Sequence, residues 1–187
     1  MRVGIDIGTD VARVAMLDAT GTPKIVRFAD GTATLPNVVR QTMHGLSVGQ
    51  AAAETIIGNS ETTVLGCTRL LGNADHLPSQ LIERSPYPVR VQQTEAMCDL
   101  LYAEQPASVM FGAVLNHIVQ QVQIVGETVE SIVLTVPASA DHRFRVQARQ
   151  AAEQHGIHVT RLVNQPTAAV LAAHLPDDVR TVLVVNC

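Results

Sequence analysis

The chain has 187 residues and a formal net charge of −4, from 13 lysine and arginine residues against 17 aspartate and glutamate residues. Twelve of the basic residues are arginine, Lys24 is the single lysine, and no polybasic run or Gly-Lys-Ser/Thr sequence occurs. This composition argues against nucleic-acid binding and excludes a P-loop nucleotide site. The apolar content of 47% can fill a sizeable core, so one domain or two closely packed subdomains are predicted.

The cysteines are three in number and share no close spacing. They therefore argue against a disulfide framework or a zinc site and favour a reducing, cytoplasmic location. We interpret Cys67 and Cys98 as inert buried thiols. The sixth residue is an acid and no long apolar run follows the start of the chain, so no signal peptide is predicted. The sequence contains no run of 18 uninterrupted apolar residues, so no membrane span is predicted.

In the first half of the chain, short apolar runs alternate with glycine turns, which predicts antiparallel strands over residues 2–7, 11–18, 24–28, 38–41 and 45–48. Helix-forming composition predicts short helices over 50–57 and 62–70, ended by Gly58 and Gly72. Residues 73–88 are predicted as a loop and 89–93 as a strand. Residues 95–104 are compatible with a helix or with the second strand of a hairpin.

The second half predicts a β-α-β-α-β order. A long helix over 106–125 has a 3.6-residue apolar period, with His117 as a packed residue of its apolar face. The elements that follow are a strand over 131–136, a helix capped by Asp141, a strand over 158–163, a helix opened by Pro166 and a strand over 181–185. The near-continuous apolar strands predict a mixed α/β fold with a sheet covered on both faces.

Asp6 is the first candidate site residue, because it lies inside an apolar strand directly before Gly8 and Thr9. A carboxylate there is costly unless it is paired or near a metal, and the turn offers N–H and hydroxyl groups suited to phosphate oxygens. Asp6 is therefore interpreted as holding a hydrated cation beside a phosphate-binding turn. An ordinary hairpin with Asp6 at its solvated end is the alternative.

The second candidate is the strand-to-helix junction at 164–169, whose polar start can direct donors at an anion. A capped helix with proline in its first turn explains the same residues.

Several segments together resemble the nucleotide-binding domain of the seventy-kilodalton heat-shock chaperones, the DnaK-like family of the actin-like ATPase superfamily. They are residues 3–9, 29–31, 35–37, 48–52, 64–72, 135–138, Arg145 and 164–169. The resemblance implies an actin-like ATPase fold with a ribonuclease-H-like core subdomain over 1–38 and 106–187. It implies an inserted smaller α+β subdomain over 39–105, with the family's second lobe and peptide-binding domain absent from this chain.

The family's properties imply ATP or ADP, Mg²⁺ and K⁺ as ligands. They also imply control of a client-binding domain by nucleotide state during protein folding and stress response. The implied partners are that domain, the second lobe, client polypeptides and co-chaperones, with no nucleic acid and no membrane. Because an isolated lobe would expose its contact face, we also expect a homodimer.

The chain departs from the family pattern at four site positions. Thr68 replaces the family's lysine that orients the attacking water, and Asp10 replaces a threonine of the phosphate loop. Gln165 replaces a glutamate that helps to hold Mg²⁺, and Asn186 replaces an aspartate. Loss of a carboxylate weakens cation binding, and loss of a positive group removes transition-state stabilisation.

The family's remaining site residues are retained here: Asp6, Gly8 and Thr9 at the phosphates, and Pro137 and Arg145 as the proline switch with its linked arginine. We therefore expect an ATP-binding lobe with impaired hydrolysis. The alternatives are a pseudo-ATPase docking module and a small-molecule kinase of the same superfamily.

Overall fold

The computed structural model describes residues 1–72, 89–93, 98–102, 104–173, 175–176 and 178–185. The strands are β1 (Arg2–Ile7), β2 (Val11–Leu17), β3 (Pro23–Ile25), β4 (Leu35–Pro36), β5 (Val38–Thr42), β6 (Gly45–Val48), β7 (Thr63–Leu65), β8 (Val89–Gln93), β9 (Cys98–Tyr102), β10 (Gln105–Pro106), β11 (Ser131–Val136) and β12 (Val159–Asn164). The helices are α1 (Gln50–Ala53), α3 (Ala107–Ile124), α4 (His142–Glu153) and α5 (Gln165–Ala172), with 3₁₀ turns η1 (Ser60–Thr62) and η2 (Cys67–Arg69).

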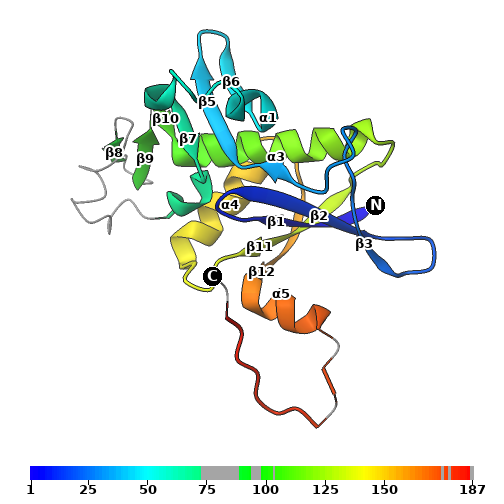
Figure 1. The fold of residues 1–187 in the computed structure, drawn as a ribbon. Helices are drawn as coiled ribbons and strands as arrows, with labels where there is room; N and C mark the ends of the chain where they lie inside the picture. Colours follow the sequence, from blue (N-terminus) through cyan, green and yellow to red (C-terminus); the bar gives the residue numbers. More distant parts are fainter. Residues whose placement is uncertain (73–88, 94–97, 103, 174, 177, 186–187) are drawn as a thin grey trace.

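The largest sheet has the strand order β12-β11-β1-β2-β3, and β4 also pairs with β2 (Figure 1). Strands β1, β11 and β12 are parallel to one another, whereas β2 is antiparallel to both β1 and β3. The predicted first hairpin is therefore confirmed, and its register sets Asp6 opposite Arg13. The β11-α4-β12-α5 order also agrees with the prediction for the second half.

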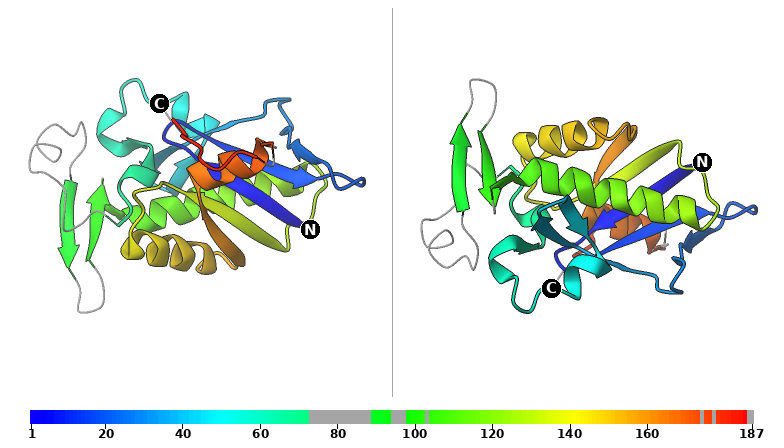
Figure 2. Two further views of the ribbon diagram at one scale, coloured as in Figure 1. Left: turned by 90° about the horizontal axis from the view of Figure 1, so that it is seen from below. Right: turned by 90° about the horizontal axis from the view of Figure 1, so that it is seen from above.

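One face of this sheet is fully buried and the other is only half covered. Helices α3 and α4 lie over the first face, and α5 lies over the second (Figure 2). Alternate residues of β1, such as Val3 and Ile5, are 1% exposed, whereas their neighbours Gly4 and Asp6 are only partly buried. Helix α5 has no buried residue. The expectation of a sheet covered on both faces is thus wrong for the described residues, because α5 is too short to cover the second face.

A smaller sheet of order β6-β5-β7, with α1 beside it, lies next to α3 (Figure 1). The helix predicted over 62–70 is wrong: the segment forms β7 and two 3₁₀ turns. The β-branched Thr63 and Val64 pair with β5, and Gly66, with φ 67°, stops the strand before a helix can begin. The helix predicted over 50–57 is shorter, ending with Ala53.

A third sheet has the order β10-β9-β8, so the ambiguous segment 95–104 contributes a hairpin strand over Cys98–Tyr102. The loop predicted over 73–88 lies outside the described residues. The strand predicted over 181–185 does not form, because a strand needs an edge to pair with and no described strand runs beside this segment.

The long helix predicted over 106–125 is confirmed as α3, and the cap predicted for α4 is confirmed by Asp141, which accepts a hydrogen bond from the Phe144 backbone N–H at 2.8 Å. Within the described part of the chain, no helix is long and apolar enough to cross a bilayer.

Candidate functional site

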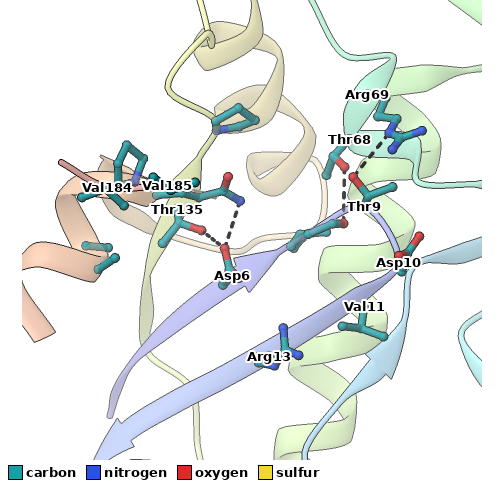
Figure 3. Close-up of a pocket in the computed structure, with 17 residues that line it drawn as sticks. Asp6, Thr9, Asp10, Val11, Arg13, Thr68, Arg69, Thr135, Val184 and Val185 are labelled. Atoms are coloured by element: carbon teal, nitrogen blue, oxygen red, sulfur yellow. Dashed lines mark hydrogen bonds between the residues drawn. The ribbon is translucent and has the colours of Figure 1, made fainter. Parts of the chain in front are cut away.

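A cavity of about 790 Å³ opens on the half-covered face of the main sheet. Its size is in the range that holds a small ligand. The β1–β2 turn, η2, the end of β11, the start of α5 and the segment after α5 contribute to it (Figure 3). The predicted site residues that line it are Asp6, Gly8, Thr9, Asp10, Thr68, Pro137 and Gln165.

Asp6 is held at the centre of the cavity wall by two side chains from distant parts of the chain. The Thr135 hydroxyl of β11 donates to Asp6 Oδ1, and Gln165 Nε2 of α5 donates to the same oxygen at 3.1 Å (Figure 3). Both contacts follow from the parallel pairing of β1, β11 and β12, which brings their carboxyl ends to one edge. The Asp6 carboxylate is thus oriented by the fold, and does not sit at a solvated hairpin end.

The turn after Asp6 is tight. The Gly8 N–H donates to the Val11 carbonyl at 3.0 Å, and a Cβ atom at Gly8 would lie 3.1 Å from that same oxygen. Thr9 Oγ1 accepts a hydrogen bond from Arg69 Nε at 3.3 Å. The turn therefore presents the compact backbone that the sequence predicts for a phosphate-binding loop.

Asn37 anchors this turn, a role that the sequence analysis missed. Asn37 is 1% exposed, and its Nδ2 donates to the Gly8 carbonyl at 2.8 Å. Its backbone N–H donates to the Asp10 carbonyl at 2.8 Å, and its carbonyl accepts from Gly66 N–H at 2.9 Å. The signal available in the sequence was a lone amide side chain at the boundary of two apolar strands, a place where a polar group needs buried partners.

Thr68 and Cys67 complete this cluster behind the turn. Thr68 is 8% exposed, and its hydroxyl lies 3.5 Å both from Asn37 Nδ2 and from the Gly8 carbonyl, to which it donates. The Cys67 thiol donates to Asn37 Oδ1 at 3.2 Å. Burial raises the pKa of the Cys67 thiol to about 12, which agrees with the predicted inert thiol. The side chain of Cys98 lies outside the described residues.

The cavity offers few ligands for a divalent cation. Mg²⁺ in proteins is usually held by one or two carboxylates and keeps several waters. Gln165 faces Asp6 with an amide N–H₂, which donates and cannot bind a cation. Across the described residues no group of three or more His, Cys, Asp or Glu side chains is suited to a metal. In the described part of the chain, Asp6 and Asp10 are the two carboxylates that line the cavity, and of these Asp6 is the one oriented by hydrogen bonds from Thr135 and Gln165.

The two residues predicted to couple the site to other domains lie differently. Pro137 lines the cavity, whereas Arg145 lies behind it on α4. Arg145 Nη2 donates to Asn164 Oδ1 at 2.5 Å, and Arg145 Nε donates to the Ala140 carbonyl at 3.2 Å. The remaining predicted residue, Asn186, lies outside the described residues.

Comparisons with known proteins give a consistent result. The family model described as Hsp70 protein matches residues 2–186. The chaperone protein dnaK of Emiliania huxleyi is 33% identical over 189 residues, which covers 97% of this chain and 30% of that protein. The chaperone protein dnaK1 of Prochlorococcus marinus strain MIT 9313 is 33% identical over 176 residues, or 91% of this chain and 26% of that protein.

A third relative, the chaperone protein dnaK of Guillardia theta, is 31% identical over 175 residues, or 91% of this chain and 28% of that protein. The chain thus spans less than a third of the length of these relatives.

Proposed function

Because the chain belongs to the Hsp70 protein family and has the mixed α/β fold of the actin-like ATPases, we propose that it binds the phosphate groups of ATP or ADP in the cavity beside Asp6. The observation that carries this proposal is the Asp6 carboxylate, oriented by Thr135 and Gln165 directly beside the tight Gly8–Thr9 turn. Backbone turns of this kind hold phosphate oxygens, and a carboxylate beside them can face a hydrated Mg²⁺ ion.

We further propose that this lobe hydrolyses ATP poorly. Thr68 brings a hydroxyl to the loop where the family has a lysine, and removal of one charge-stabilising donor commonly costs about 3–4 kcal/mol of transition-state stabilisation. Gln165 turns a neutral donor toward Asp6 where the family has a carboxylate that helps to hold the cation. Asp10 adds a negative charge at the cavity wall, so phosphate binding is also expected to be weak.

In the whole protein, this lobe is proposed to control a client-binding domain by its nucleotide state, as part of a cytoplasmic chaperone in the stress response. Its partners are then a second lobe, a peptide-binding domain, client polypeptides and co-chaperones. The core subdomain comprises residues 1–38 and 106–187, and the inserted subdomain comprises 39–105. The hydrogen bond between Arg145 and Asn164, whose next residue Gln165 donates to Asp6, offers a route from the cavity to α4 for such control.

The alternative is a docking module without nucleotide chemistry. Large apolar side chains are exposed on and after α5, among them Leu171 at 73% and Leu183 at 87%. This surface is the basis for the proposed homodimer, because exposed apolar patches usually mark an interface. A small-molecule kinase of the same superfamily is a third and weaker candidate, since all of the relatives above are chaperones.

Calorimetric titration of the 187-residue chain with Mg-ATP and Mg-ADP tests the proposal. We expect saturable, weak binding, reduced by Asp6→Asn and unchanged by Glu61→Gln, which removes an exposed carboxylate on η1. Turnover of ATP is expected at the level of a protein-free blank. Absence of any nucleotide binding at millimolar concentration would reject the nucleotide site and favour the docking module. Robust turnover would contradict the impaired site.

A further inference from the structure

Arg13 brings a positive charge into the cavity that the sequence analysis assigned to no function. It projects from β2 directly opposite Asp6 of β1, on the half-covered face of the sheet, and lines the cavity (Figure 3). Side chains directly opposite on antiparallel strands have Cβ atoms about 4.5–5.5 Å apart. Arg13 and Asp6 are therefore neighbouring residues of the same wall.

Despite this proximity, Asp6 and Arg13 form no ion pair. The Asp6 carboxylate is turned toward β11 and α5 by Thr135 and Gln165, away from β2. Within the described part of the chain, Arg13 makes no hydrogen bond or ion pair at all. Its five N–H donors are thus available to a ligand.

A positive group at this place would also offset the negative charges that line the cavity. Asp6 and Asp10 contribute two negative charges, and the Gln165 amide that faces Asp6 contributes none. Thr68 contributes no charge, and Arg69, which also lines the cavity, is already engaged in a hydrogen bond to Thr9 Oγ1. A polyphosphate in this cavity needs positive charge, and an arginine fork matches phosphate oxygens bidentately.

We infer that Arg13 binds the phosphate groups directly and takes over the charge-neutralising part of the divalent cation, so that polyphosphate binding depends on Arg13 and not on Mg²⁺. The inference rests on the proposed nucleotide site and specifies how that site holds an anion. The structural observation is a guanidinium that lines the cavity beside Asp6 and has no hydrogen-bond partner among the described residues.

Titrations of the 187-residue chain with ATP and with inorganic tripolyphosphate, each in excess Mg²⁺ and in excess chelator, test this inference. The variants are Arg13→Gln and Arg13→Lys. Arg161→Gln is the matched control, because Arg161 is an exposed arginine of β12 in the same sheet that does not line the cavity. Circular dichroism and thermal unfolding verify that each variant is folded; exposed strand positions usually tolerate such changes.

The wild-type chain is expected to keep saturable ATP binding in chelator as well as in Mg²⁺. Arg13→Gln is expected to weaken that binding about tenfold or more, since a charge-assisted hydrogen bond is lost. Arg13→Lys should recover part of the loss, and Arg161→Gln should bind like the wild type.

The outcomes separate this inference from the nucleotide proposal. ATP binding that requires Mg²⁺ and is unchanged in Arg13→Gln would overturn the role of Arg13 and leave the nucleotide site standing. Tripolyphosphate binding through Arg13 with no binding of ATP would retain the anion site and reject the nucleotide. A wild-type chain that binds neither compound would reject both.

Discussion

Arg145 Nη2 donates to Asn164 Oδ1 at 2.5 Å and so ties α4 to the last residue of β12. The next residue in the chain is Gln165, whose side chain donates to Asp6 in the cavity wall. A helix on the buried face of the sheet is thereby connected, through two hydrogen bonds and one peptide unit, to the carboxylate on the opposite side. A displacement of α4 is therefore expected to move the Asp6 carboxylate.

The pair Arg145 and Asn164 is expected to be energetically coupled. In a double-mutant cycle of Arg145→Ala and Asn164→Ala, we expect a coupling energy of about 1–3 kcal/mol in urea unfolding, because the bond is charge-assisted and half-buried. Arg149→Ala is the control. Arg149 lies on the same helix but donates to the Val159 carbonyl, so its effect should add to that of Asn164→Ala. If the effects of Arg145→Ala and Asn164→Ala on the free energy of unfolding were additive, the contact would contribute nothing to stability.

Asn37 is expected to support both the fold and the phosphate turn. Asn37→Ala removes the 2.8 Å hydrogen bond to the half-buried Gly8 carbonyl and leaves the Cys67 thiol without its side-chain acceptor, and should lower the free energy of unfolding by about 1–3 kcal/mol. It should also weaken ATP binding, because the turn loses its anchor. Asn116→Ala, a half-buried change on α3 outside the phosphate cavity, should have little effect on either measurement. Unchanged nucleotide binding in folded Asn37→Ala would contradict the anchoring role.

Gln165→Glu is expected to create a cation site. The Gln165 amide nitrogen lies 3.1 Å from Asp6 Oδ1, so a carboxylate there would face Asp6 at close range and the two charges would repel. A divalent cation relieves this repulsion. The unfolding temperature of the variant should therefore rise with added Mg²⁺, and Mn²⁺ binding should appear in paramagnetic resonance titrations. The control Gln154→Glu adds a carboxylate at an exposed position near the end of α4 and should show neither effect.

Addition of Thr68→Lys to Gln165→Glu tests whether the proposed loss of hydrolysis is due to these positions. The two changes together are expected to raise ATP turnover, measured by phosphate release, above that of the unmodified protein. The matched pair Gln123→Lys and Gln154→Glu adds the same charges at exposed positions and should not. Equal turnover in both pairs would indicate that the phosphate site has been abandoned for catalysis.

His117 is expected to make stability depend on pH. It is half-buried on α3 against Gly49, and burial lowers its pKa. The unfolded chain then binds a proton at a higher pH than the folded chain does. Stability is therefore lost as the pH falls through the ordinary histidine value of about 6.5. His117→Gln should show a smaller decrease in urea midpoint from pH 7.5 to 5.5 than the wild type. His44→Gln, at an exposed turn, should keep the full decrease, and equal slopes in all three chains would exclude His117 as the source.

Much of the local structure could be predicted because its causes are local. The Gly8 turn between two apolar runs predicted the first hairpin, the 3.6-residue period predicted α3, and Asp141 predicted the start of α4. The errors fall where pairing partners are distant in the chain. Thr63 and Val64 form a strand because β5 offers an edge, whereas residues 181–185 have strand-like composition but no described partner.

By itself, the sequence determined the first hairpin, α3, the capped start of α4 and the candidate residues Asp6, Gly8 and Thr9, since turns, caps and periodicity depend on neighbours in the chain. Thr68 and Gln165 came from the family resemblance. Only the tertiary structure decided that Asn37 anchors the turn and that Arg13 lines the cavity without a hydrogen-bond partner among the described residues. The physical reason is that the roles of the Asn37 amide and the Arg13 guanidinium depend on atoms that are distant in the chain and become neighbours only through packing. That packing joins segments up to 159 residues apart, as in the contact of Gln165 with Asp6.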